Sequence, residues 1–288
     1  MNTGRPVAGV TGTPPDTEPV VLDTASAPTG LLDALGRQVD YWATAARRTW
    51  RGGFATAFIT PLLYVAAMGV MLGRHVDASS PGVGGAPSYL HFVAPGLLAG
   101  QAMLLAFGDA TYPVYGKVTW DKTYVGMIAT PLRVVDVALG HLSAIVVRVT
   151  LSCAIFMIAL SLFGLFGSWL GAFGALLACA LVAFAFAAVI FGLSAGLRND
   201  SAFPVIYRVV QVPMYLFSGA FFPLDAMPAV VQWLATLNPL WHGVQLARMA
   251  MLGEPAWSAI AGHAAVLLLI GAVGTWWSVR RLTHRLIA

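Results

Sequence analysis

Charged residues are few in this chain, and one short polar stretch between long apolar segments, residues 117–133, has the sequence KVTWDKTYVGMIATPLR. This stretch holds the only two lysines, Lys117 and Lys122, together with Asp121 and Arg133. No Walker A pattern, G-x-x-x-x-G-K-[ST], surrounds Lys117, because the glycine loop and the hydroxyl residue are both missing. We therefore expect that the chain does not bind ATP by that route.

The histidines and cysteines are too scattered to indicate a metal or redox site. None of the 6 histidines stands at a metal-ligand spacing from another, and H-E-x-x-H is absent. Cys153 and Cys179 lie in apolar runs without the spacing of a zinc site, which favours buried packing residues. The sequence therefore predicts no metal ligands and no catalytic residues, although an enzyme that acts on a small molecule in the membrane remains an alternative.

The composition indicates a polytopic membrane protein. Hydrophobic residues make up 58% of the 288 residues and charged residues 10%, whereas an ordinary soluble domain has about 25% charged residues. A helix needs about 20 mostly apolar residues to cross the bilayer, so the chain can supply six spans. Because the apolar runs are long and lack a ten-residue alternation, we expect an all-α membrane protein rather than a β-barrel. The net charge of +4 does not indicate nucleic-acid binding, since the basic residues gather beside the spans.

The chain divides into three predicted segments. Residues 1–30, rich in Pro, Thr, Gly and Asp, should form a disordered cytoplasmic tail. Residues 31–52 repeat apolar side chains every three to four positions and should form an amphipathic helix in the membrane interface, although a soluble helix packed on a partner would show the same pattern. Residues 53–288 should form the six-span domain. Its spans are predicted at residues 54–72, 88–108, 134–166, 169–197, 203–222 and 257–277.

The basic residues predict the orientation in the membrane. With both termini in the cytoplasm, 13 of the 16 Lys and Arg residues fall in cytoplasmic segments, which is the bias that cytoplasmic loops show. Arg74 and Arg248 fall outside, and Arg148 lies within the third span. We therefore expect a multi-pass plasma-membrane (inner-membrane) protein with cytoplasmic termini. The 13 residues are Arg5, Arg37, Arg47, Arg48, Arg51, Lys117, Lys122, Arg133, Arg198, Arg208, Arg280, Arg281 and Arg285.

Two features inside the membrane region are unusual. Arg148 should face protein or water, because a charged side chain near the bilayer centre costs about 2.5–3.5 kcal/mol on insertion scales. It could form a structural ion pair, extend toward the headgroups, or line a substrate path.

Residues 223–255 are apolar but repeatedly broken by proline. Short re-entrant helices at 228–237 and 240–251 would fit, since irregular backbone at this depth must lie against protein or a watery cavity.

The sequence offers little for ion-coupled transport. Such carriers usually have acidic residues deep in their spans, whereas Asp109 and Asp136 are predicted near the cytoplasmic ends. A membrane subunit that is driven by a separate protein is therefore favoured. A motor-free channel and an ion-coupled secondary carrier remain the alternatives.

Two segments resemble the ABC type-2 permeases of the daunorubicin-resistance and nodulation-factor-export branch. Residues 217–253, FSGAFFPLDAMPAVVQWLATLNPLWHGVQLARMAMLG, are similar to the family's hallmark segment, with F-S-G-x-x-F-P, N-P-L and a downstream arginine, here Arg248. Residues 119–141, TWDKTYVGMIATPLRVVDVALGH, are similar to its loop after the second span, with T-P-L and a following aspartate, here Asp136. The family often carries a glutamate where this chain has His141.

The resemblance implies a half-transporter. Two six-span permeases, either two copies of this chain or this chain and a paralogue, would pair with two cytoplasmic ATP-binding subunits and would contact membrane lipid. ATP and Mg²⁺ would be bound by the partner subunits, and this chain would bind no cofactor. The complex would export a hydrophobic or amphiphilic cargo such as a drug, a lipid or a lipid-linked glycan.

The family's coupling helix, which docks into the ATP-binding subunit, corresponds here to residues 120–130. Trp120 and Tyr124, four residues apart, would then share one helical face. A plain interfacial loop whose aromatic side chains lie among headgroups would also fit. The implied coupling residues are Trp120, Asp121, Lys122, Thr123, Tyr124, Met127 and Ile128.

The segment around the end of the fifth span supplies candidates for a substrate path and an outer gate. The path candidates have aromatic or soft side chains that suit a greasy cargo and would equally suit packing between two permeases. They are Met214, Tyr215, Phe217, Phe221 and Phe222, with Arg148. The gate candidates are Pro223, Pro228, Asn238, Pro239 and Arg248.

Overall fold

The computed structural model describes residues 86–224, 227–253 and 256–287, together with Gly36, Tyr41, Trp42, Thr44, Leu63, Ala66 and Ala67. Apart from those isolated positions, the predicted tail at 1–30, interfacial helix at 31–52 and first span at 54–72 lie outside the described residues. Every regular element in the described ranges is a helix, as the all-α prediction requires.

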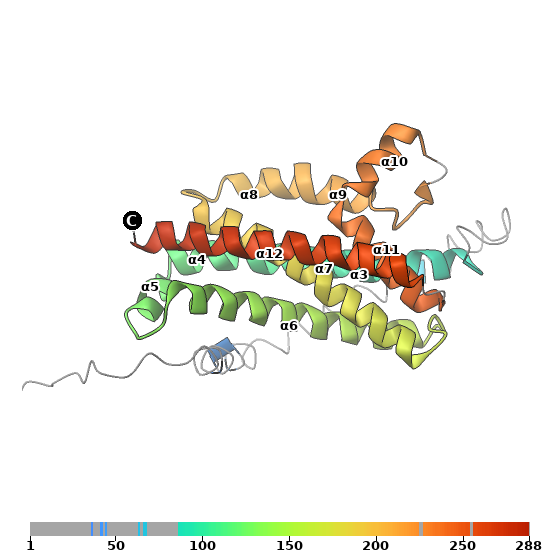
Figure 1. Ribbon diagram of the computed structural model, residues 1–288, viewed down its shortest axis with the longest axis horizontal. Helices are drawn as coiled ribbons and strands as arrows, with labels where there is room; N and C mark the ends of the chain where they lie inside the picture. Colours follow the sequence, from blue (N-terminus) through green and yellow to red (C-terminus); the bar gives the residue numbers. More distant parts are fainter. Residues whose placement is uncertain are drawn as a thin grey trace, which may run out of the picture.

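Four helices in the described ranges are long and apolar enough to cross a membrane. They run side by side along the long axis of the molecule (Figure 1), and α7 contacts each of the others. Small residues let them approach closely; a Cβ on Gly271 of α12, for example, would lie 2.2 Å from Cε1 of Phe184 on α7. The four are α3 (Tyr89–Ala110) continued by α4 (Tyr112–Thr119), α6 (Val134–Ser161), α7 (Trp169–Gly196) and α12 (Trp257–Ile287).

The predicted fifth span is a shorter helix made of three consecutive pieces. They are α8 (Ala202–Val205), the π-helix η2 (Ile206–Gln211) and α9 (Val212–Leu216), of four, six and five residues. Fifteen residues at about 1.5 Å each reach only about 22 Å, less than the roughly 30 Å of bilayer hydrocarbon. The helix does not continue to residue 222 as predicted, because the chain turns at Gly219, whose φ is 73°. The count of six spans therefore stays a prediction.

The π-helix η2, whose turns are wider than those of an α-helix, ends at Gln211, two residues before Pro213. Proline has no amide N–H, so the carbonyl of Val209 loses the hydrogen bond that an α-helix would give it from position 213. Local π-helical adjustment is a common response where the regular ladder is interrupted. The proline therefore accounts for the irregular part of this helix.

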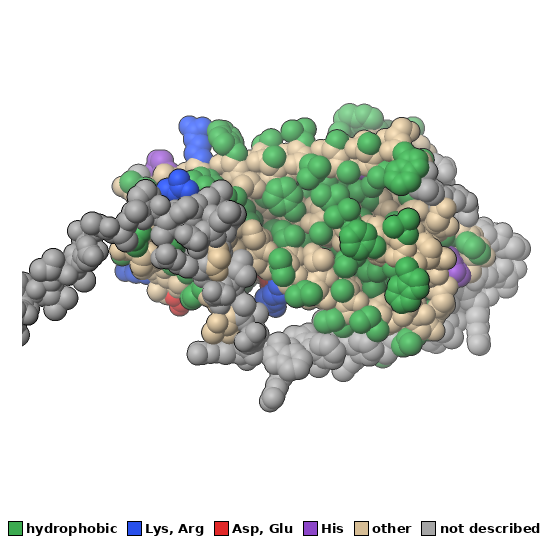
Figure 2. Space-filling view, turned by 60° about the horizontal axis from the view of Figure 1, so that its bottom comes forward, with side chains coloured by type: hydrophobic (Ala, Val, Ile, Leu, Met, Phe, Trp, Pro, Cys, Tyr) green, Lys and Arg blue, Asp and Glu red, His purple; other side chains and the backbone are tan. Residues whose placement is uncertain are grey.

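The two ends of the helix bundle differ in charge. The basic end comprises residues 117–133, 197–201 and 280–287, and α4, α5 (Thr123–Ile128) and the C-terminus lie together there (Figure 1). The opposite end, the α10 end, contains α10 (Ala229–Thr236) and α11 (Pro239–Leu252), where the sequence predicts short helices at 228–237 and 240–251. Figure 2 shows hydrophobic side chains over the centre and right of one face, with Lys and Arg in its left half. The basic end holds Lys117, Lys122, Arg133, Arg198, Arg280, Arg281 and Arg285.

Arg148, in the middle of α6, forms an ion pair with Asp109 of α3. Its Nη1 lies 2.8 Å from Oδ1 of Asp109, whose side chain is 14% exposed, while that of Arg148 is 63% exposed. A structural ion pair was one of the readings that the sequence left open. The pair joins two neighbouring helices, and a role for Arg148 in a substrate path stays a prediction.

Replacing Arg148 with alanine should lower the thermal stability of the detergent-solubilised protein, because the largely buried Asp109 carboxylate loses its cation. The double variant Arg148→Ala/Asp109→Ala should recover part of that loss. A double-mutant cycle should give a coupling free energy of about 0.5–3 kcal/mol. Strictly additive effects of the two substitutions would show that the ion pair contributes nothing to stability.

Candidate coupling site and the Arg248 pocket

The predicted coupling residues surround the connection between α4 and α5. α4 ends at Thr119, Lys122 adopts a left-handed conformation with φ 51° and ψ 27°, and α5 begins at Thr123. A left-handed backbone is uncommon for any residue other than glycine, and it interrupts the helix predicted over 120–130. Trp120 and Tyr124 consequently do not share a helical face, and that part of the prediction was wrong.

Tyr124 is buried inside the helix bundle. Its side chain is 0% exposed, its hydroxyl lies 2.5 Å from Nδ1 of His141, and its ring packs near Phe191 of α7. Burial raises the pKa of the Tyr124 phenol, so the group stays protonated and can donate a hydrogen bond at pH 7. From this position Tyr124 cannot reach another protein, and it fixes α5 to the helices beneath it.

Trp42, one of the isolated described residues, contacts the same place. The Trp42 ring stacks on His141, with 3.9 Å between ring centroids and 7° between planes, and Nζ of Lys117 lies 4.9 Å from the Trp42 ring. We call Trp42, Tyr124, His141 and Phe191 the anchoring cluster. It joins Trp42, α5, α6 and α7 through direct side-chain contacts.

The side of the α4–α5 connection opposite Tyr124 is exposed. Trp120 is 58% exposed and Val125 is 46% exposed, and the Trp120 ring leans edge-on against Tyr115, with centroids 5.4 Å apart. Of the other predicted coupling residues, Thr123, Met127 and Ile128 are half-buried. Val125 and Gly126 are also exposed and were not among the predicted coupling residues; the sequence carries no signal for them, because the burial of Tyr124 emerges only from the structure. We call the exposed set, Trp120, Asp121, Lys122, Val125 and Gly126, the docking face.

The far side of the connection is fixed by Arg133 and Asp136. Nε and Nη2 of Arg133 donate to the two carboxylate oxygens of Asp136, each at 3.0 Å, and the Arg133 amide also donates to Asp136. The Asp136 carboxylate accepts a hydrogen bond from the backbone N–H of Arg133, the residue that caps the start of α6. A carboxylate in the first turn also complements the helix dipole. The pair therefore fixes where α6 begins after the α4–α5 region.

A polar pocket lies at the α10 end, around Arg248 of α11. It has a volume of about 170 Å³ and is lined by Phe92, Gly219, Pro223, Leu224, Trp241, Gln245 and Arg248. The Arg248 guanidinium donates to the carbonyl oxygens of Gly219 at 2.9 Å and Phe92 at 3.4 Å. Burial lowers the pKa of Arg248 to about 10, so the side chain is still a cation at pH 7. We call this cavity the Arg248 pocket.

The other predicted gate residues shape the chain near this pocket. Asn238 caps α11 by accepting a hydrogen bond from Leu240 N at 3.0 Å, and its amide donates to the carbonyl of Met214 at 2.6 Å. Pro239 is the first residue of α11, Pro228 immediately precedes α10, and Pro223 lines the pocket. Asn238 and Arg248 thus tie the start and the body of α11 to the end of the fifth helix and the turn that follows it.

The path candidates do not face one common space. Tyr215 packs into α3, where a Cβ on Gly100 would lie 2.1 Å from its ring, and its ring meets Phe221 edge-on with centroids 5.2 Å apart. Phe217 and Phe222 are instead 48% and 59% exposed. Tyr215 and Phe221 therefore pack inside the fold, whereas Phe217 and Phe222 are exposed, although all four lie within residues 215–222.

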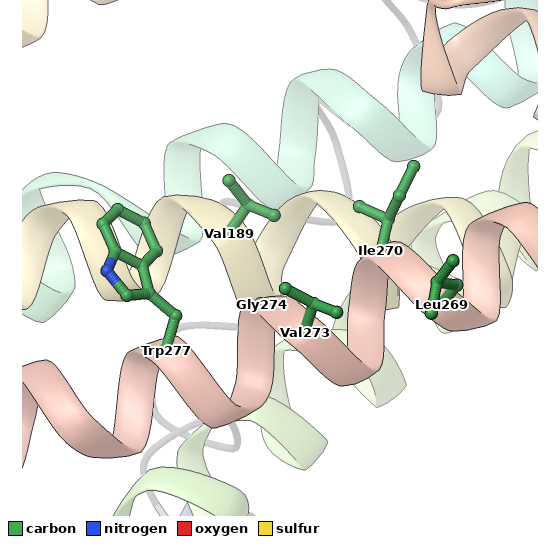
Figure 3. A pocket seen from close by; sticks show the side chains of 6 residues that line it. All are labelled: Val189, Leu269, Ile270, Val273, Gly274 and Trp277. Atoms are coloured by element: carbon green, nitrogen blue, oxygen red, sulfur yellow. The ribbon is translucent and has the colours of Figure 1, made fainter.

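A second hollow, away from the Arg248 pocket, is almost wholly apolar. It has a volume of about 390 Å³ and lies between α7 and α12. Figure 3 shows its lining side chains, one from α7 and the rest from α12. No polar group points into it, so it can accept a hydrocarbon chain but cannot carry out chemistry. Its residues are Val189, Leu269, Ile270, Val273, Gly274 and Trp277.

Two histidines that are distant in sequence meet at the α10 end. Nδ1 of His242 on α11 lies 2.8 Å from Nδ1 of His263 on α12. Sequence spacing could not reveal this pair, because the two residues belong to different helices. In the part of the chain that the structure describes, no group of three or more His, Cys, Asp or Glu side chains could hold a metal ion. The pair therefore serves as a contact between α11 and α12.

One pentapeptide, GLSAG at residues 192–196, matches the G-x-S-x-G pattern of serine hydrolases. In those enzymes the serine lies at a sharp turn between a strand and a helix. Here all five residues lie in the last turns of α7, and Ser194 is 1% exposed. Ser194 is therefore not presented as a nucleophile.

Comparison with known proteins identifies the class to which this architecture belongs. The family model described as ABC-2 type transporter matches residues 41–252, which is more than half of the chain. The chain belongs to this family, and the predicted family is confirmed. It is a multi-pass membrane protein of the ABC-2 permease type.

Individual relatives align over most of their length. Nodulation protein J of Rhizobium leguminosarum bv. trifolii is 31% identical over 250 residues, which cover 85% of this chain and 90% of the relative. Nodulation protein J of Rhizobium leguminosarum bv. viciae is 29% identical over 269 residues, covering 92% of this chain and 100% of the relative. The inner membrane transport permease YadH of Escherichia coli is 23% identical over 209 residues, covering 72% and 78%.

Proposed function

We propose that this chain is the membrane-spanning permease subunit of an ATP-driven exporter. Two cytoplasmic ATP-binding subunits, which bind ATP and Mg²⁺, drive two permeases that are copies of this chain or this chain and a paralogue. The cargo is hydrophobic or amphiphilic and moves outward across the plasma membrane. Residues 53–288 form the six-span domain, residues 31–52 lie in the interface, and residues 1–30 and both termini are cytoplasmic.

The observation that carries this proposal is the docking face itself. An exposed tryptophan and valine project from a short connection that is anchored underneath by Tyr124 and His141. Exposed aromatic anchors on a rigid support are typical of sites where a partner protein binds tightly. The same end carries most of the described basic residues, and this supports a cytoplasmic location through the positive-inside bias.

In the proposed cycle, ATP binding draws the two ATP-binding subunits together and displaces both docking faces. Each anchoring cluster passes the displacement to α6 and α7, so the spanning helices rock as rigid bodies and open a path between the two permeases. Residues 223–253 act as the outer gate. Phe217 and Phe222 are exposed where a greasy cargo would leave.

The test is reconstitution in proteoliposomes with and without the ATP-binding subunit that copurifies with the chain. Movement of fluorescently labelled phospholipid between leaflets should require that subunit, ATP and Mg²⁺. Mass spectrometry of molecules that copurify with the complex should identify the natural cargo. Equal transport by the purified chain without an ATP-binding subunit would support a channel or an ion-coupled carrier instead.

A further inference from the structure

We infer that the Arg248 pocket binds the phosphate group of an amphiphilic lipid cargo. The inference rests on the proposed export function and adds the chemical class of the cargo's polar part. It is carried by three observations on the described residues: the neutral surroundings of the Arg248 guanidinium, its unused hydrogen-bond donors, and the size and lining of the cavity beside it.

The charge of Arg248 is not neutralised by any carboxylate in the described ranges. The ion pairs there are Arg133–Asp136 and Arg148–Asp109, both in other parts of the fold. Among the described residues, the partners of Arg248 are neutral: two backbone carbonyls, Oε1 of Gln245 at 3.3 Å, and the face of Phe92, whose centroid is 4.2 Å from Cζ. A largely desolvated cation is costly unless an anion compensates it, and a bound anionic ligand would do so.

Donor groups remain available around the pocket. Nε of Arg248 is buried and has no hydrogen-bond partner. Because Gln245 uses its Oε1 to accept from Arg248, its NH₂ group remains as a further donor. Both N–H groups of Nη2 already donate to carbonyl oxygens, so the donors that can meet a phosphate oxygen are the second N–H of Nη1 and the NH₂ group of Gln245.

The size and position of the pocket fit a lipid headgroup. A volume of about 170 Å³ is large enough for a phosphate and too small for a whole lipid. The turn that supplies Gly219 and Pro223 to the pocket also carries Phe217 and Phe222, which are exposed and can contact hydrocarbon chains. Residues of α11 and of the turn after the fifth helix line the pocket, and α10 and α11 lie at the end of the molecule opposite α4 and α5 (Figure 1), where an exported headgroup would arrive. Phosphate and chains of one molecule can therefore be bound together.

The binding test uses the full chain purified in neutral nanodiscs, without ATP or partner subunits. Dihexanoyl phosphatidic acid is titrated by calorimetry, with dihexanoyl glycerol as the analogue that lacks phosphate and inorganic phosphate as the free anion. We expect phosphatidic acid to bind and dihexanoyl glycerol not to bind measurably. Arg248→Gln should weaken phosphatidic acid binding about tenfold or more, since hydrogen bonds to a charged group are lost. Arg280→Gln, which removes a cation at the basic end, should leave the affinity unchanged.

Arg248 also holds two backbone carbonyls, so Arg248→Gln needs a second variant beside it. Gln245→Leu keeps the cation and the two backbone contacts of Arg248, so it should lower the thermal unfolding temperature less than Arg248→Gln while weakening binding severalfold. Equal affinities of the wild type, Arg248→Gln and Arg280→Gln would overturn the inference. Binding of dihexanoyl glycerol as tight as that of phosphatidic acid would overturn it without any variant. Inorganic phosphate that binds as tightly as phosphatidic acid would overturn the assignment to a lipid. Because no ATP is involved, failure here is distinguishable from failure of export.

Discussion

Replacing Trp120 with alanine is expected to weaken binding of the ATP-binding subunit by roughly 30-fold, because an interface tryptophan of this kind contributes about 2 kcal/mol or more. Cargo-stimulated ATP hydrolysis should fall with the affinity. The stability of the permease alone should change little, since Trp120 is 58% exposed and its main contact within the fold is the edge of Tyr115. Binding is measured with the permease in nanodiscs, and stability by thermal unfolding.

Trp276 provides a matched control for this experiment. It is also a tryptophan near the basic end and is 61% exposed, but it lies on α12 beside Arg280 and outside the docking face. Trp276→Ala should leave the affinity for the ATP-binding subunit unchanged. If both variants bind equally well, or lose affinity equally, residues 120–126 are not the site at which the partner docks.

Unlike Trp120→Ala, Tyr124→Ala is expected to lower the stability of the permease strongly. Any weaker binding of the ATP-binding subunit should follow from this loss of stability. Removing a fully buried aromatic ring costs about 3–5 kcal/mol, and the substitution also leaves the His141 imidazole without its partner. Without this anchor, α5 should separate from α6 and α7. The measurement is thermal unfolding of the purified chain, followed by hydrogen exchange of residues 123–128.

Tyr124→Phe separates the two contributions of this residue. It keeps the ring against Phe191 and removes only the hydroxyl, so the loss should be about 1–3 kcal/mol. If Tyr124→Ala unfolds at the same temperature as the wild type, the residue is not the anchor that its burial indicates. If Tyr124→Phe is as unstable as Tyr124→Ala, the hydrogen bond to His141 matters more than the packing of the ring.

The spanning helices could be predicted closely because long apolar runs leave the backbone no alternative in lipid. The predicted spans at 88–108, 169–197 and 257–277 correspond to α3, α7 and α12, although α12 continues to Ile287. The fifth helix was predicted too long. Hydrophobicity continues through residues 217–222, but the turn at Gly219 depends on a backbone conformation that hydropathy does not report.

The roles of the candidate site residues stay predictions, and the geometry of these residues could not be predicted from the sequence. The family resemblance and the charges pointed to residues 117–133, yet the i, i+4 rule assumed an unbroken helix and so placed Tyr124 on the wrong side. One left-handed residue, Lys122, reverses that assignment. The partner of Arg148 is 39 residues away and the partner of His242 is 21 residues away, so periodicity within one helix could not identify either contact.

The short fifth helix also has a consequence for the surrounding lipid. In the proposed six-span topology, about 22 Å of helix at residues 202–216 would adjoin hydrocarbon that is elsewhere roughly 30 Å thick, so the bilayer would thin locally or the turn at 217–224 would lie below the outer headgroups. Either arrangement shortens the apolar distance that a headgroup has to traverse along this helix. We therefore expect the barrier to headgroup passage to be lowest beside this helix, because hydrophobic mismatch occurs there. We also expect transport to be slower in thicker membranes.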